Sequence, residues 1–303
     1  MEALDPDVIA RVEQLTLAAK EASLGAISGI HSAKRRGTSV EFAEHKEYAP
    51  GDDVRRIDWR AYARFDRYYL KQFQDEANLK VYVVFDASGS MGYGDGTRGT
   101  NKLAYARTLA AGLCHLALSQ RDAVGLMTLA DGGREFLPAR TRSSHFEEIV
   151  HRLVRAQPKG KGALAAGVTS LTELVRGRGL CIVISDLLDR ARPGDQSVLD
   201  ALEVIAARGI EVSVLHVQHP DERDFPFETP AFFSSMEDSR RMFVQPRVLQ
   251  KMFVQEMQRY RQEVAVRLSA ARIDHQLAWT DGPPAELLSA YLSRRMHLLR
   301  VRA

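Results

Sequence analysis

An apolar run followed by a polar loop decides the fold of this chain: Val81-Tyr-Val-Val-Phe-Asp-Ala-Ser-Gly-Ser-Met91. Residues 81–85 are too few and too rich in β-branched side chains for a helix, so they predict a buried strand. The loop then places Asp86, Ser88 and Ser90 at alternate positions. Open α/β sheets bind ligands at the carboxyl ends of their strands, and Mg²⁺ prefers such oxygen donors. The loop is therefore a candidate cation site, although Ser, Gly and Asp are also ordinary turn residues.

A second apolar run, Leu180-Cys-Ile-Val-Ile-Ser185, also ends in an aspartate, Asp186. The carboxyl ends of parallel strands meet at one edge of a sheet, so Asp86 and Asp186 could face each other there. Two neighbouring carboxylates repel unless one takes up a proton or a cation lies between them. The pair favours a divalent cation site that solvent can reach. The alternative for Asp186 is a helix cap before Leu187.

Strands and amphipathic helices alternate outward from these two runs. This alternation predicts an α/β fold, a mostly parallel sheet with helices on both faces. A segment rich in Phe and Pro over 224–233 is predicted to be irregular. Helices are expected at about 102–119, 144–155, 163–176, 196–207, 247–272 and 284–296, and strands at 123–129, 135–137, 210–217 and 275–279.

The residues before the first run predict two further segments. Residues 1–27 contain a helix, because apolar residues recur at helical spacing between Asp7 and Leu24. Residues 28–78 are aromatic, charged and rich in turn residues, which predicts a small β-rich arm; residues 79–303 form the α/β domain with a C-terminal helical extension. The arm contains the charged run Gly51-Asp-Asp-Val-Arg-Arg-Ile-Asp-Trp59. It either docks a partner or forms an internal ion-pair network, and we favour the network.

Composition excludes several classes of function. The chain is 45% apolar and 27% charged with a formal net charge of +3, so it does not indicate nucleic-acid binding. It lacks a window of about 18 consecutive apolar residues, so no membrane span is expected. Its acidic start does not look like a signal peptide. Cys114 and Cys181 have no CxxC partner, so we expect free thiols in the cytoplasm rather than a zinc site.

The motif Asp86-Ala-Ser-Gly-Ser90 resembles the metal-ion-dependent adhesion site (MIDAS) of von Willebrand factor A domains, and the order of strands and helices agrees. The resemblance implies that Asp86, Ser88, Ser90 and Asp186 hold Mg²⁺, with Mn²⁺ or Ca²⁺ as alternatives. It also requires a threonine in a second loop, but Ala163 stands at that position. Thr169 lies roughly 9 Å further along the helix axis. The site therefore either binds metal weakly or has lost it.

The chain from about residue 30 to 295 also resembles domain-of-unknown-function family fifty-eight. The resemblance rests on Tyr48, Gly51–Trp59, Tyr62-Ala-Arg64, Lys71, Glu76, the downstream Ser-Gly-Ser-Met, and Asp224-Phe-Pro-Phe227. It implies a non-enzymatic adaptor or partner of a MoxR-type AAA+ ATPase in chaperone-like remodelling. A Glu or Asp of the partner would complete the coordination of the cation.

Two other functions stay open. One is a metal-dependent hydrolase or phosphatase that acts through Asp86, although a phosphoaspartate enzyme would place a second carboxylate where Ser88 stands. A serine nucleophile would need a histidine base, and none of the nine histidines follows a core strand in an obvious loop. The other is a structural scaffold with a degenerate metal site, which the alanine at position 163 favours.

Overall fold

The computed structural model describes residues 79–94, 99–175, 179–188 and 197–302, with only the backbone for 296–302, and short pieces of the first 78 residues. Those pieces are residues 14, 16, 17, 19–21, 24, 46, 47, 69 and 70. The chain divides into two compact units: one is His31–Asn78, and the other combines Met1–Ile30 with Leu79–Ala303.

Six strands form the central sheet of the larger unit, in the order β10-β7-β6-β3-β4-β5. Every neighbouring pair is parallel except β4 and β5, which are antiparallel. The strand of this sheet that comes first along the chain, β3, therefore lies in its interior, which is typical of a doubly wound sheet. The strands are β3 (Lys80–Asp86), β4 (Ala123–Ala130), β5 (Gly133–Arg140), β6 (Leu180–Ser185), β7 (Glu211–Gln218) and β10 (Asp274–Trp279).

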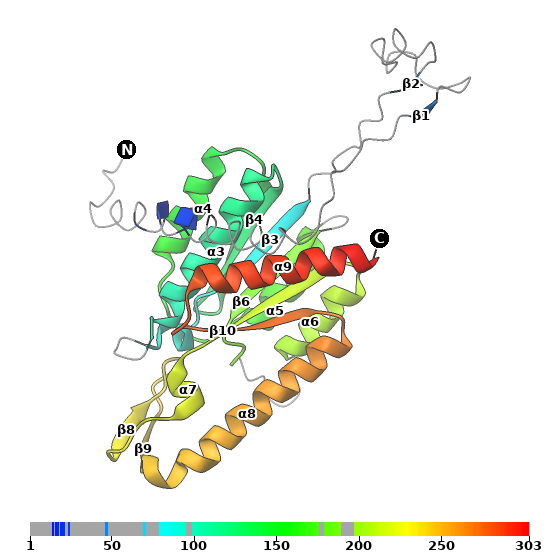
Figure 1. The fold of residues 1–303 in the computed structure, drawn as a ribbon. Helices are drawn as coiled ribbons and strands as arrows, with labels where there is room; N and C mark the ends of the chain where they lie inside the picture. Colours follow the sequence, from blue (N-terminus) through cyan, green and yellow to red (C-terminus); the bar gives the residue numbers. More distant parts are fainter. Residues whose placement is uncertain are drawn as a thin grey trace, which may run out of the picture. The chain divides into compact units, whose positions relative to one another are not determined.

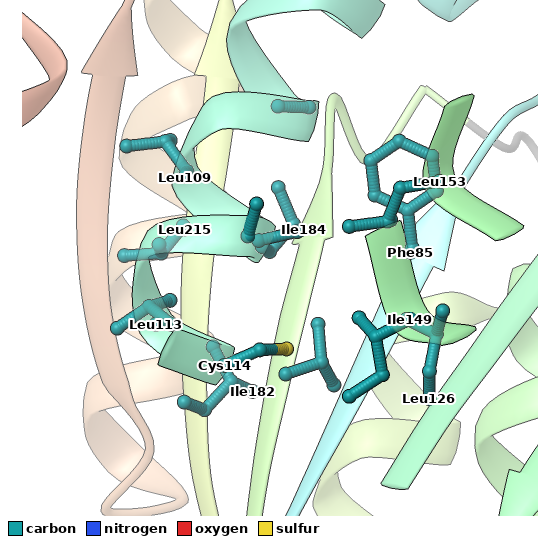
Figure 2. Close-up of a cluster of buried hydrophobic side chains, with 14 of the residues drawn as sticks. Phe85, Leu109, Leu113, Cys114, Leu126, Ile149, Leu153, Ile182, Ile184 and Leu215 are labelled. Atoms are coloured by element: carbon teal, nitrogen blue, oxygen red, sulfur yellow. The ribbon is translucent and has the colours of Figure 1, made fainter. Parts of the chain in front are cut away.

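Helices cover both faces of this sheet, as the continuous apolar strands require (Figure 1). On one face lie α3 (Lys102–Ser119), α4 (Ser144–Arg155) and α9 (Pro284–Arg302). On the other lie α5 (Leu164–Leu174), α6 (Val198–Ala207) and α8 (Pro246–Ala270). Figure 2 shows Phe85 and Ile184 of the two central strands packed against Leu109 and Ile149 of the first helical layer. The predicted α/β fold is confirmed.

Residues 225–230, the larger part of the segment expected to be irregular, form neither helix nor strand, as predicted. The sequence pattern did not predict the elements on either side: α7 (Pro220–Asp224), and a hairpin of β8 (Ala231–Ser234) and β9 (Arg241–Val244). Phe225 adopts a left-handed backbone conformation that ends α7, and its ring lies 4.5 Å from that of Phe253 in α8. These long-range aromatic contacts hold the hairpin, so the local sequence pattern does not show it.

Only a few residues before position 79 are described. Those between residues 14 and 24 are helical, and β1 (Lys46–Glu47) pairs with β2 (Tyr69–Leu70) in an antiparallel manner. The run Gly51–Trp59 and most of the predicted β-rich arm lie outside the described residues. None of the described helices combines the length and apolarity needed to cross a membrane.

Candidate functional site

The two central strands bring the predicted acidic residues to the same edge of the sheet. Phe85 of β3 is paired with Ile184 of β6. Asp86, which follows Phe85, and Asp186, two residues after Ile184, therefore lie near each other at the ends of the two strands. Asp86 is 2% exposed and Asp186 is 1% exposed. Their carboxylates lie close enough that the charge of Asp186 raises the pKa of Asp86. Two carboxylates that lie far apart in the sequence therefore share one buried site.

Hydrogen bonds fix both oxygens of Asp86. Its Oδ1 accepts from the backbone N–H of Ser88 at 2.9 Å, and its Oδ2 accepts from Ser185 Oγ at 2.5 Å. Burial, together with the negative charge of Asp186, raises the pKa of Asp86 to about 6. Asp86 is therefore the group in this site whose charge changes near neutral pH.

The two predicted hydroxyls lie beside these carboxylates. Ser88 and Ser90 flank the start of the short helix η2 (Gly89–Gly92), and their Oγ atoms are 3.1 Å apart. The Ser90 side chain also hydrogen-bonds with Asp186 and lowers the pKa of that carboxyl. All four predicted residues thus belong to one connected group of oxygen atoms.

Sequence reasoning missed the cation in this group, Lys102. Its Nζ atom donates to Asp186 Oδ2 at 2.7 Å and to Glu222 Oε1 at 2.8 Å, and the residue is 1% exposed. Burial opposes the charge of Lys102, but the two carboxylates outweigh burial and raise its pKa above the ordinary value. The same contact holds the pKa of Asp186 below its ordinary value, although burial alone would raise it. Lys102 thus neutralises one of the two predicted acidic ligands.

Local capping explains how Lys102 reaches the site. Asn101 caps the amino end of α3 by accepting from Ala104 N at 3.1 Å, and its amide donates to Gly92 O at 2.7 Å. These bonds tie the beginning of α3 to the end of η2. A lysine at the amino end of a helix is unfavourable for the helix dipole. That unfavourable placement, together with the helical spacing of Lys102 from Tyr105 and Leu109 on the buried side of α3, is the signal in the sequence that could have identified Lys102 as functional.

The loop that would supply the missing threonine lies against the loop that carries Ser88 and Ser90, and backbone hydrogen bonds of Lys159 and Gly160 join the two. Gly89 N donates to Gly160 O at 2.9 Å, and Lys159 N donates to Ala87 O at 3.1 Å. Ala163 caps α5 without a side-chain hydrogen bond. Thr169 Oγ1 donates to Ala165 O at 2.8 Å within the same helix. Ala163 therefore provides no hydroxyl, and Thr169 uses its own for a local bond.

The site is more enclosed than the sequence hypothesis requires. Asp86, Ser88 and Asp186 are buried, and Ser90 is only partly exposed. The turn of the β8–β9 hairpin lies over η2: a Cβ on Gly89 would lie 2.0 Å from the carbonyl oxygen of Met236. The expectation of carboxylates open to solvent is therefore wrong. The hairpin, which that hypothesis did not include, packs on η2 beside them, and Ser90 is the one of the four residues that is partly exposed.

The donor set fits a small hard cation in its chemistry, with two hydroxyls and two carboxylates. Lys102 pairs with Asp186 and Glu222, whereas the ion pairs within the described part of the chain include none for Asp86, so ionised Asp86 adds negative charge that no ion pair compensates. Within the described ranges, no group of three or more His, Cys, Asp or Glu side chains is arranged to hold a metal ion. A cation here would depend on the serine hydroxyls.

Solved structures similar to this chain share little sequence with it. The conserved hypothetical protein BatB from Bacteroides thetaiotaomicron is 18% identical, with a TM-score of 0.44; the match covers 71% of this chain and 98% of that one. A von Willebrand factor type A protein from Catenulispora acidiphila is 15% identical, with a TM-score of 0.31; it covers 46% of this chain and 33% of that one.

Curated relatives and a family model match the chain over a longer range. The uncharacterized proteins Rv1480 of Mycobacterium tuberculosis and Mb1516 of Mycobacterium bovis are each 30% identical over 226 residues, which is 73% of this chain and 68% of the relative. The model described as protein of unknown function DUF58 matches residues 44–263, more than half of the chain. The chain therefore belongs to the DUF58 family.

Proposed function

We propose that this protein is a non-enzymatic protein-binding module with a divalent cation site of the adhesion type. The observation that supports the proposal is the convergence of four oxygen-bearing side chains at the ends of two neighbouring parallel strands. Ser88 and Ser90 would bind the cation directly through hydroxyls 3.1 Å apart. Asp86 and Asp186 would orient its waters or bind it. Mg²⁺ suits this site best, with Mn²⁺ and Ca²⁺ as alternatives.

Recognition by such a site depends on charge. Because Lys102 already pairs with Asp186, Asp86 is the acid that responds to an added cation. Neutral hydroxyl ligands leave a bound cation able to accept a further carboxylate. An Asp or Glu of the partner would supply that carboxylate in a charge-assisted contact.

The proposed partner is a MoxR-type AAA+ ATPase, with which the protein would act as an adaptor in chaperone-like remodelling. Membership of the DUF58 family supports this partner through the resemblance described above. We also propose a cytoplasmic location. Its support is that Cys114 and Cys181 are both free and buried, as expected for thiols in a reducing compartment.

A hydrolase or phosphatase acting through Asp86 is less well supported. Both Asp86 oxygens already accept hydrogen bonds, from Ser88 N and Ser185 Oγ, and the side chain is buried. A nucleophile must reach its substrate in the correct geometry. A scaffold with a degenerate metal site remains the alternative to the binding module, and metal titration separates the two.

We expect the double variant Ser88→Ala, Ser90→Ala to weaken Mg²⁺ or Mn²⁺ binding about ten- to a hundredfold. The reason is that it removes the two direct ligands while keeping both carboxylates. Isothermal titration calorimetry measures the loss, and Ser119→Ala, on the far end of α3, is the matched control. A wild-type protein that binds no divalent cation would instead support the scaffold.

Restoring the missing hydroxyl should strengthen the site. We expect Ala163→Thr to tighten Mg²⁺ binding about tenfold, which corresponds to about 1.4 kcal/mol. Ala163 is the capping residue of α5, a position that accepts threonine well. The control is Ala163→Val, which has the shape of threonine without its oxygen. Equal affinities for the Thr and Val variants would show that this loop does not contribute a ligand.

The partner is tested by binding of the purified MoxR-type ATPase of the same organism to the immobilised protein. We expect binding with Mg²⁺ and its loss with EDTA or in Asp86→Ala. Binding that is unchanged by EDTA and unchanged in Asp86→Ala would count against the metal-dependent mechanism.

A further inference from the structure

Exposed large apolar side chains of the described residues concentrate on one part of the molecule. Six of the eleven lie on the β8–β9 hairpin, its turn and the first turns of α8: Phe232, Met236, Met242, Phe243, Val248 and Met252. Figure 1 shows this hairpin beside α7 and the beginning of α8. Clusters of this kind on a folded surface mark interaction sites more often than scattered apolar residues do.

The two faces of the hairpin have different roles. On the inner face, the Phe233 ring lies 5.3 Å from that of Phe227, and Val244 is buried. On the outer face, Phe232 and Phe243 are paired directly across the strands with ring centroids 5.4 Å apart. They are 63% and 55% exposed. The inner face holds the hairpin on the domain, so the outer aromatic pair is available to another molecule.

Charge on the outer face favours an acidic molecule. Arg241 lies over the ring of Phe232, with 5.6 Å between the guanidinium carbon and the ring centroid. Ion pairs within the described part of the chain neutralise Arg240, through Asp238, and Arg247, through Glu228. Those ion pairs include none for Arg241. A carboxylate of the partner would pair with the guanidinium of Arg241. Apolar side chains next to that carboxylate would pack on Phe232 and Phe243.

The strand edges of the hairpin are a second feature that could bind a partner. β8 and β9 form a sheet of two strands, so in the described structure each has an edge without a partner strand. Exposed edges beside apolar side chains promote pairing with another chain, and proteins normally protect them. An extended segment can add to such an edge as a further strand. The occupant that fits is therefore extended, apolar and acidic.

This surface adjoins the proposed cation site. Met236, in the hairpin turn, approaches η2 so closely that only glycine fits at position 89, and its Cε atom would lie 3.4 Å from a Cβ on Gly92. The hairpin turn thus borders the loop that carries Ser88 and the partly exposed Ser90. A single partner can contact both.

We propose that the outer face of the hairpin, defined by Phe232, Arg241 and Phe243, is the docking surface for the protein partner. The partner contributes an extended segment in which apolar side chains flank a carboxylate. This inference rests on the proposed function and adds the chemistry of the partner and the place where it binds.

The experiment measures binding of the purified MoxR-type ATPase to the full chain, with Mg²⁺ and with EDTA. We expect Phe232→Ser combined with Phe243→Ser to raise the dissociation constant about tenfold or more, and Arg241→Glu to raise it as well. The control is Val266→Ser, because Val266 is 62% exposed on the later part of α8. The melting temperature and the Mg²⁺ affinity of the hairpin variants should equal those of the wild type.

The outcomes separate this inference from the proposed function. Loss of binding in Asp86→Ala and in EDTA, but not in the hairpin variants, overturns the docking surface and leaves the proposed function standing. Loss in the hairpin variants alone supports the surface and overturns the metal-dependent contact. Two results assign the surface to another occupant and overturn the proposal: a dimer in sedimentation that the double variant abolishes, or flotation with phosphatidylglycerol vesicles that it abolishes. An ATPase that binds no version of the protein overturns both.

Discussion

Replacing Lys102 by methionine should lower the free energy of unfolding by about 3–5 kcal/mol, the usual cost of removing one partner from a buried ion pair. Methionine keeps most of the apolar stem but leaves Asp186 and Glu222 without their shared donor. For a domain of this size, the loss corresponds to a fall in melting temperature of about 6–20 °C. Chemical and thermal unfolding in EDTA measure it.

An exposed ion pair in the same protein provides the matched control. Lys159 lies 2.7 Å from Asp131, the same distance as in the buried pair, but the two side chains are 72% and 53% exposed. Exposed pairs contribute about 0–1 kcal/mol, so Lys159→Met should unfold almost as the wild type does. Mg²⁺ should restore part of the stability of Lys102→Met, because it brings positive charge to the same carboxylates. Equal losses in the two variants would show that Lys102 is not the counter-ion of the site.

Lys102 also shows why the site could be predicted only in part. Asp86 and Asp186 were found because each directly follows an apolar strand, and parallel strands share an edge. Lys102 contacts residues that lie 84 and 120 positions away in the chain. Within its own helix it stands three, four and seven residues before Tyr105, Ala106 and Leu109, so it lies on the buried side of α3, but this spacing does not identify its partners. Its burial depends on α7 and β6 arriving at the same place, which local pattern does not reveal.

Prediction of the fold likewise succeeded where the pattern is local and failed where long-range contacts decide the structure. Strands and helices of the sheet domain were predicted within a few residues, because each has a continuous apolar run or a clear helical period. The β8–β9 hairpin was missed, since its strands are short and Phe233 of β8 packs on Phe225, which in turn contacts Phe253 of α8. The same omission explains why the site was expected to be open. Met236 covers η2 from a hairpin that the sequence pattern does not predict.

The pH dependence of stability should report the charge of Asp86. Its pKa is about 6 in the folded protein against an ordinary value of 3.8, so between these pH values the native state holds a proton that the unfolded chain has lost. The free energy of unfolding in EDTA should therefore fall as the pH rises from about 4 to 6 and then level off. Asp86→Asn removes this ionisation and keeps an acceptor for Ser88 N. It should stabilise the metal-free protein at pH 8 by about 1–3 kcal/mol.

A divalent cation should reverse this pattern, because it favours the ionised form of Asp86. Stabilisation of the wild type by saturating Mg²⁺ should be small at pH 5 and grow through pH 6, where Asp86 loses its proton without the metal. In Asp86→Asn the stabilisation should be weaker and independent of pH over this range. Melting curves with Mg²⁺ and with EDTA at each pH measure both effects. If Mg²⁺ stabilised the two proteins equally at every pH, the buried carboxylate of Asp86 would have no part in holding the cation, and Ser88, Ser90 and Asp186 would have to account for it.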